Sequence, residues 1–349
     1  MAERLRAVAA TPLAADLADL IRDTVPGLDL VVEQELLPRM RFPADFDGDP
    51  SFTRTAEQQR RFDGLLAQAD VLYGLPDVDP AALRRVADEN PRLRWVHTMA
   101  AGGGAQVKAA GLDAEQLARI LFTTSAGVHG DTLAEFAVFG VLAGAKHLGR
   151  LRELQAAREW PMRWEMGQVA EQRVLVLGLG GIGRVVATRL AGLGAEVIGA
   201  ARTTTAADGV ARVLPIGELA SVTGQVDAIV STLPGTAATT GLIGTDLLAR
   251  VKPGVTLVNV GRGTVVDEPA LVAALLDGRV GFAALDVFAV EPLPASSLLW
   301  DLPNVVISPH TAGLSSGEER RIAELFADNA RRLLDGRPLR NRVDTVEFY

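Results

Sequence analysis

The segment Arg173–Arg184 reads RVLVLGLGGIGR, and the helix-like pattern VVATRLAGLGA follows it. The apolar run Val174–Leu177 is typical of a strand that is buried on both faces of a parallel sheet. Glycine-rich turns are common, so the G-x-G-x-x-G spacing alone is weak evidence. Here it follows a strand, opens a helix and precedes a second expected strand, Glu196–Ala200. This order predicts a strand–helix–strand unit that binds a dinucleotide.

Each glycine of this turn has a distinct physical role in such a unit. Gly178 makes the tight turn, Gly180 lets the backbone approach a pyrophosphate, and Gly183 lets the helix pack closely on the strand. Backbone N–H groups at the start of the helix, at Gly181 and Ile182, then face the phosphates. The alternative is an ordinary strand-to-helix turn that happens to contain spare glycines.

The end of the second strand indicates which dinucleotide is bound. An NAD site usually has Asp or Glu here to accept hydrogen bonds from the ribose hydroxyls. This chain instead has Ala201, Arg202 and Thr203, while Glu196 lies at the wrong end of the strand. A guanidinium beside hydroxyl groups suits a 2′-phosphate, so we expect NADP to be preferred over NAD. Arg202 could otherwise be a solvated loop residue.

Short apolar runs separated by helical patterns recur along the whole chain. They predict α/β architecture with parallel sheets covered on both faces. The 349 residues, 48% of them hydrophobic, suffice for two doubly wound, Rossmann-like domains. The expected strands are Leu28–Val32, Val71–Tyr73, Trp95–Thr98, Val174–Leu177, Glu196–Ala200, Ala228–Ser231, Thr256–Val260, Gly281–Ala284 and Val305–Ser308.

Two long helical patterns, Leu133–Leu148 and Ser315–Leu334, bracket the middle of the chain. Ser315 or Ser316 is expected to cap the second helix, and Gly336 to end it. This bracket suggests that the C-terminal helix returns to the first domain.

Composition and charge exclude several classes of function. The chain has no cysteine, which excludes disulfides, thiolate metal sites and a cysteine nucleophile, and it offers no cluster of metal ligands. A formal charge of −8 without a basic block disfavours nucleic acid and anionic membranes as partners. The first residues do not resemble a signal peptide and the apolar runs are short, so we expect a cytoplasmic location.

Three later segments each place polar residues just after an apolar strand. They read VNVGRGTVVDE from Val258, ALDVFAVEP from Ala284 and NVVISPHTAG from Asn304. In an open parallel sheet, ligands bind beyond the carboxyl ends of the strands, so the three turns can converge on one crevice.

The glycine turn and these three segments, in this order and spacing, closely resemble the D-isomer-specific 2-hydroxyacid dehydrogenase family. The resemblance extends from about Val71 to about Leu334. It implies a cofactor domain inserted into a discontinuous substrate domain. We therefore expect residues 1–126 to form the first part of the substrate domain, 127–311 the NAD(P)-binding domain, and 312–349 the C-terminal return helix of the substrate domain.

The resemblance also implies the catalytic residues. Arg262 would bind the carboxylate and carbonyl oxygen of the substrate, and Glu291 would pair with His310, the general acid and base. Reduction of a 2-oxo acid needs a proton at the carbonyl oxygen as hydride reaches the carbon, and histidine changes protonation near neutral pH. A planar guanidinium suits a carboxylate and stabilises developing alkoxide charge. Taken singly, each residue could instead be structural.

Further positions follow from the resemblance alone. Ala101 and Gly102 would present backbone N–H groups to the substrate carboxylate, although most relatives carry an Asp near Gly104, which this chain lacks. The remaining positions expected to contact the cofactor are Leu233, Pro234, Thr240, Val260, Asp286 and Gly313. The apolar loop Glu159–Met166 is expected at the interface of a homodimer.

The substrate expected from this pattern is a small 2-oxo or 2-hydroxy acid. An arginine at the position of Arg202 is common among the glyoxylate and hydroxypyruvate reductases of this family. The resemblance therefore makes glyoxylate and hydroxypyruvate the leading candidate substrates. Phosphite and 3-phosphoglycerate remain alternatives, whereas formate enzymes of the family have Gln where Glu291 stands. A different class also stays open, a nucleotide-sensing corepressor built on the same fold, because such proteins retain the catalytic residues.

Overall fold

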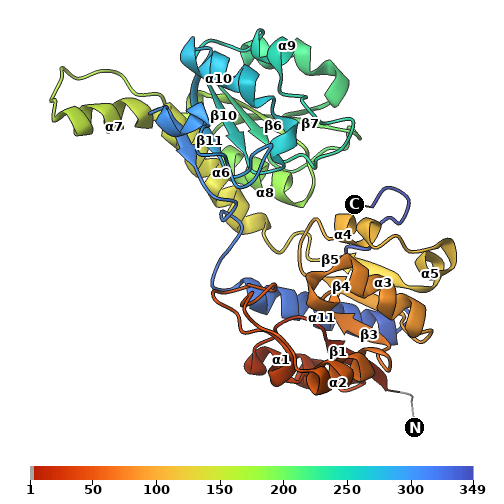
Figure 1. Ribbon diagram of the computed structural model, residues 1–349. Helices are drawn as coiled ribbons and strands as arrows, with labels where there is room; N and C mark the ends of the chain where they lie inside the picture. Colours follow the sequence, from red (N-terminus) through yellow and green to blue (C-terminus); the bar gives the residue numbers. More distant parts are fainter. Residues whose placement is uncertain (1–3, 349) are drawn as a thin grey trace. The chain divides into compact units, whose positions relative to one another are not determined.

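A computed structural model describes residues 4–348 and divides the chain into two compact units. Residues up to His129 and those from Leu314 onward form one, here called the terminal unit. Gly130–Gly313 form the other, the central unit. Each has its own parallel sheet with helices around it (Figure 1). The predicted fold class, two doubly wound α/β domains with one inserted into the other, is confirmed.

The terminal unit is built on a five-stranded parallel sheet in the order β2-β1-β3-β4-β5. Its strands are β1 Leu5–Ala9, β2 Leu28–Val31, β3 Val71–Tyr73, β4 Trp95–Thr98 and β5 Leu121–Thr124. Its α-helices are α1 Ala15–Thr24, α2 Ala56–Leu66, α3 Pro80–Glu89, α4 Gly104–Ala109, α5 Ala114–Arg119 and α11 Glu318–Leu334, and its 3-10 turns are η1 Gln34–Leu36 and η2 Pro76–Val78.

The core of the terminal unit explains why the end of the chain belongs to it. Phe326 of α11 stacks on Trp95 of β4, with ring centroids 4.8 Å apart. It also meets the ring of Tyr73 of β3 edge-on at 5.1 Å. All three side chains are fully buried. Aromatic burial of this kind contributes strongly to a core, so α11 is held against the sheet.

The central unit is built on a seven-stranded parallel sheet in the order β12-β11-β10-β9-β6-β7-β8. Its strands are β6 Arg173–Leu177, β7 Glu196–Ala201, β8 Arg212–Pro215, β9 Ala228–Ser231, β10 Val255–Asn259, β11 Val280–Leu285 and β12 Val305–Ile307. Its α-helices are α6 Gly130–Ala145, α7 Leu148–Ala157, α8 Gly181–Gly192, α9 Thr245–Leu248 and α10 Glu268–Leu276. Its 3-10 turns are η3 Val169–Glu171, η4 Ile216–Ser221, η5 Thr223–Gln225, η6 Gly263–Val265 and η7 Leu298–Asp301.

All nine expected strands are present within a residue or so of their predicted bounds. The sequence analysis missed β1, β5 and β8. The first two are short and mix apolar residues with Arg or Thr, and β8 is an edge strand ending in Pro215. Edge strands tolerate Pro and polar residues, so they carry a weak pattern.

The helix termini required corrections. The helix predicted at Leu133–Leu148 is α6, which begins and ends three residues earlier than predicted. His147, in a left-handed conformation, separates α6 from α7. The predicted serine cap of α11 is wrong, because Gly317 precedes the helix and no side chain caps it. Ser315 Oγ instead accepts a hydrogen bond from Arg321 Nη2 at 2.6 Å. Gly336 does end α11, with φ of +65°.

No helix in the described part of the chain is long and apolar enough to cross a membrane.

Candidate active site

Five neighbouring strands of the central sheet end at the same level. In the ladder pairings, Leu177 is level with Ser231, Ser231 with Asn259, Asn259 with Leu285, and Leu285 with Ile307. These are the last residues of β6, β9, β10, β11 and β12. The turns that follow them therefore open from one edge of the sheet, where parallel sheets bind ligands. Those turns begin with Gly178, Thr232, Val260, Asp286 and Ser308.

The glycine turn has the geometry that its spacing predicts. Gly178 has φ of +92°, which L-residues rarely adopt. A Cβ on Gly183 would lie 1.8 Å from the carbonyl oxygen of Gly178, so only glycine permits this contact between helix and strand. Gly180, which precedes α8, has no side-chain cap, and a Cβ there would meet no described atom within 4 Å. The start of α8 at Gly181 and Ile182 is thus open to a phosphate group.

The second strand brings Arg202 to the same edge. Ala200 of β7 is level with Leu177 of β6, so the residues after Ala200 lie beside the glycine turn. Arg202 and Thr203 are exposed there. Glu196 lies at the opposite end of β7, where it pairs with Arg173 at 2.8 Å. No carboxylate therefore occupies the position that usually accepts from an NAD ribose.

Glu291 and His310 form a direct pair. Nδ1 of His310 donates to Oε2 of Glu291 at 2.7 Å, and Oε1 of Glu291 accepts from the N–H of Phe288 at 2.9 Å. Partial burial opposes ionisation, but these hydrogen bonds and the charges of His310 and Arg262 hold the pKa of Glu291 below its usual value. The pair fixes Nδ1 of the imidazole and leaves Nε2 for a reacting group. His310 has φ of +55°, a strained conformation that is frequent at functional sites.

The backbone around His310 is held by Asp286, which is 1% exposed. Oδ1 of Asp286 accepts from Ser308 Oγ at 2.6 Å and from the N–H groups of Thr311 and Ala312, each at 3.0 Å. The carbonyl of Asp286 accepts from the N–H of His310 at 2.9 Å. One buried carboxylate therefore orders the whole turn that carries the histidine.

Arg262 is presented on a turn with little freedom. Asn259 Nδ2 donates to the carbonyl of Arg262 at 3.1 Å, and Nη1 of Arg262 donates to the carbonyl of Gly261 at 2.8 Å. A Cβ on Gly263 would lie 1.8 Å from the backbone of Phe288, so the Arg262 turn and the Glu291 turn pack backbone to backbone. The Arg262 side chain is exposed at this edge.

Comparison with known proteins agrees with this geometry. Residues 138–312 match the model of the D-isomer specific 2-hydroxyacid dehydrogenase family, NAD binding domain. Glyoxylate/hydroxypyruvate reductase B of Yersinia enterocolitica is 33% identical over 298 residues, which cover 83% of this chain and 88% of that protein. The chain belongs to this dehydrogenase family.

Two further similarities describe relatives within the 2-hydroxyacid dehydrogenase family. (S)-sulfolactate dehydrogenase of Chromohalobacter salexigens is 36% identical over 207 residues, 58% of this chain and 66% of that protein. The crystal structure of a family member from Xanthobacter autotrophicus Py2, in complex with NADPH and MES, superposes with a TM-score of 0.77 at 29% identity, over 100% of both chains.

The remaining predicted positions of this dehydrogenase lie in both units. Ala101 and Gly102 are in the terminal unit, in the turn between β4 and α4, whereas the Arg262, Glu291 and His310 side chains are all in the central unit. The other predicted positions in the central unit are Leu233 and Pro234 after β9, Thr240, Val260 after β10, and Gly313 at its end.

Sequence reasoning missed the residues that hold the turns of Arg262, Glu291 and His310 in place. Asn259, Gly263 and Ser308 act through backbone or carboxylate contacts, and Asp286 was assigned only to the cofactor. A signal was present, because a fully buried Asn or Asp at the end of an apolar strand needs hydrogen-bond partners. His97 of the terminal unit is fully buried between Thr123 and Ser125, and burial lowers its pKa to about 3.

Proposed function

We propose that this protein is a reductase that transfers hydride from NADPH to a small 2-oxo acid, with glyoxylate or hydroxypyruvate as the leading substrates. The observation that carries the proposal is the Glu291–His310 pair at the same sheet edge as the glycine turn and Arg262. The Yersinia relative is named for reduction of the same two acids.

The residues divide the work as follows. Bound NADPH supplies the hydride. His310, held through Nδ1 by Glu291, uses Nε2 to give a proton to the carbonyl oxygen as the carbon is reduced. The guanidinium of Arg262 binds the carboxylate and stabilises the oxygen as negative charge develops on it. In the terminal unit, the backbone N–H groups of Ala101 and Gly102 are proposed, from the family resemblance, to bind a substrate carboxylate. In the direction of oxidation, His310 removes the hydroxyl proton.

We assign the preference for NADP to Arg202 and Thr203 at the end of β7. Their exposure beside the glycine turn, and the absence of a carboxylate at Ala201, support a site for a 2′-phosphate. The related Xanthobacter structure contains NADPH, which agrees with this assignment. Leu233, Pro234, Thr240, Val260 and Gly313 are proposed to line the rest of the cofactor site. The three hydrogen bonds to the Asp286 carboxylate from described residues all end on Oδ1. Its other oxygen, Oδ2, is therefore the atom that we propose contacts the nicotinamide amide.

The division into domains has a functional meaning in this proposal. Residues 127–311 would bind the cofactor, and residues 1–126 and 312–349 would select the substrate. The compact units of the structure have their boundaries at His129/Gly130 and Gly313/Leu314, two or three residues further along the chain.

We further propose that the protein is a cytoplasmic homodimer that pairs through the α7 arm. Helix α7 and the segment after it project from the rest of the central unit (Figure 1). The segment exposes Trp160 completely and Met162 by 89%. Surface exposure of several large apolar side chains on one projecting segment favours an interface. Trp160→Glu should raise the monomer fraction in sedimentation equilibrium, and an unchanged dimer fraction would contradict the arm's role.

The reductase proposal is tested by NADPH oxidation with a panel of 2-oxo acids that includes glyoxylate, hydroxypyruvate, sulfopyruvate and 3-phosphohydroxypyruvate. We expect turnover with at least one small acid, and His310→Gln should lower its kcat at least about a hundredfold. Tight NADPH binding without turnover on any of them would instead favour the nucleotide-sensing corepressor class.

A further inference from the structure

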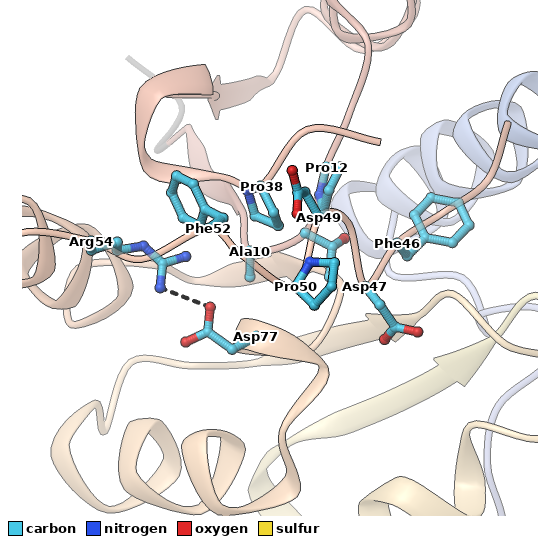
Figure 2. Close-up of a pocket in the computed structure, with 11 residues that line it drawn as sticks. Ala10, Pro12, Pro38, Phe46, Asp47, Asp49, Pro50, Phe52, Arg54 and Asp77 are labelled. Atoms are coloured by element: carbon cyan, nitrogen blue, oxygen red, sulfur yellow. Dashed lines mark hydrogen bonds and ion pairs between the residues drawn. The ribbon is translucent and has the colours of Figure 1, made fainter. Parts of the chain in front are cut away.

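A long, largely irregular loop, residues 32–55, connects β2 to α2. Together with the residues after β1 and after β3, it encloses a cavity of about 290 Å³ (Figure 2). Loops of this length without regular structure are uncommon and are usually functional. The cavity volume lies near the lower end of the range for small-molecule sites.

The cavity lies at the point where the sheet changes direction. In the order β2-β1-β3, the chain passes from β1 to β2 on one side, and β3 then adds on the other side of β1. The cavity is lined by residues just beyond the carboxyl ends of β1 and β3, including Thr11 and Asp77. Doubly wound sheets with this strand order bind ligands at such a position.

Arg54 supplies a buried donor that the protein itself does not use. Its side chain is 6% exposed and lies over the ring of Phe62 at 3.8 Å. Nε donates to the carbonyl of Leu36 at 2.7 Å and Nη1 to Asp77 at 2.8 Å, whereas buried Nη2 has no hydrogen-bond partner among the described residues. Figure 2 shows Nη2 directed toward the cavity. A buried donor without a partner is costly, so an acceptor atom from a ligand would stabilise it.

The charges around the cavity restrict the chemistry of that ligand. Asp77 already neutralises Arg54. Asp47 and Asp49 also line the cavity, and hydrogen bonds from Ser51 lower the pKa of Asp49. Asp47 is exposed and makes no hydrogen bond or ion pair within residues 4–348. The lining is thus net negative, which disfavours an anion. Asp47 and Oδ2 of Asp49, the oxygen that Ser51 does not contact, can each accept a hydrogen bond from a ligand donor.

A hydroxyl group is both donor and acceptor, so a chain or ring of hydroxyls meets both demands at once. The side chains of Phe46 and Phe52 add apolar walls against which C–H groups can pack. We propose that this cavity binds a neutral polyhydroxylated compound of monosaccharide size, with one hydroxyl accepting from Arg54 Nη2 and others donating to Asp47 and Asp49. The inference rests on the terminal unit alone and goes beyond the proposed reductase function.

The test is calorimetric titration of the full-length protein with glycerol, erythritol, xylitol, glucose and ribose, without cofactor. We expect saturable binding of at least one probe to the wild type. Asp47→Asn keeps the shape of an exposed side chain that makes no hydrogen bond or ion pair with another described residue, and it should raise the Kd at least about fivefold, as loss of a charged acceptor predicts. Arg54→Gln should remove binding. Asp29→Asn, an exposed residue of β2, is the matched control and should leave the Kd unchanged.

Three results would overturn the inference. One is the absence of saturable binding by every probe to the wild type. Another is a Kd that Asp47→Asn leaves unchanged, a measurement that stays informative even if Arg54→Gln fails to fold. The third is tighter binding of sulfate or malonate than of any polyol, lost in Arg54→Gln, which would make the cavity an anion site. Because the readout is binding without cofactor, failure of the reductase proposal would not produce any of these results.

Discussion

Replacement of Glu318 by Gln should make the protein more stable, by an amount that grows with pH. Glu318 stands in the first turn of α11 with its side chain 4% exposed. Oε1 lies 3.2 Å from Nδ1 of His129, and Oε2 has no hydrogen-bond partner among the described residues. Burial raises the pKa of Glu318 from 4.5 to about 7, against the opposing effects of the backbone at Ser315 and the charge of Arg321.

The magnitude follows from these two values. The folded state holds the proton more tightly than the unfolded state, so Glu318 favours folding least when it is ionised. The stabilisation of the folded state by protonated Glu318 is fully present below about pH 4.5 and is lost as the pH rises through about 7. At about 1.4 kcal/mol for each pKa unit, the loss reaches about 3 kcal/mol at pH 8 and is under about 1 kcal/mol at pH 5. Gln resembles the protonated acid in size and carries no charge at any pH.

The assay is urea unfolding of the wild type and Glu318→Gln between about pH 5 and about pH 8. The difference in free energy of unfolding should widen by about 2 kcal/mol over that range, with the variant more stable at the upper end. Glu324→Gln on the exposed face of the same helix is the control and should change stability little at either pH, because its ion pair with Arg320 is exposed. A difference between wild type and Glu318→Gln that stays constant with pH would refute the reasoning.

Three further predictions concern the catalytic and cofactor residues. His310→Gln should lower kcat at least about a hundredfold with little change in the Kd of NADPH, as judged by fluorescence titration; near-wild-type turnover would remove His310 from the mechanism. Arg262→Lys keeps the charge but loses the planar fork, so kcat/KM for glyoxylate should fall steeply; substantial activity with Lys would contradict a bidentate role. The wild type should prefer NADPH to NADH at least about tenfold in kcat/KM, and Ala201→Asp combined with Arg202→Ser should reverse that order at constant ionic strength. A wild type that favours NADH would refute the role of Arg202.

The sequence was sufficient for six of the seven strands of the central sheet, all but the edge strand β8, because those strands are buried and locally encoded. Val174–Leu177 and Ala228–Ser231 are continuous apolar runs bounded by Gly or polar turns, and both are fully buried. The strands that escaped prediction, β1, β5 and β8, contain Arg, Thr or Pro, and these positions are explained only by the neighbouring strands of the folded sheet. Helix ends were less predictable, since α11 begins at Glu318 without the serine cap that its sequence offers.

The pairing of His310 with Glu291 agrees with the sequence prediction, whereas the contacts that orient the pair were not predicted. Glu291 and His310 lie in the turns that follow β11 and β12, at the sheet edge where a parallel sheet binds ligands. The left-handed backbone of His310 and the three hydrogen bonds to Asp286 Oδ1 depend on where two turns meet in space. No local pattern encodes that meeting.

The two units differ in how far their candidate functional residues can be identified from short stretches of sequence. In the central unit, Arg262, Glu291 and His310 lie three to six residues after the end of a strand, so their chain positions indicate which sheet edge they occupy. In the terminal unit, Arg54 reaches its partners at Leu36 and Asp77 across 18 and 23 residues of the chain, and the donor it leaves unpaired becomes evident only when those partners are known. In the sequence alone, Arg54 resembles any other arginine of a surface loop. Burial turns it into a group that requires an acceptor, and this is why the cavity in the loop of residues 32–55, rather than any sequence motif, points to a second ligand.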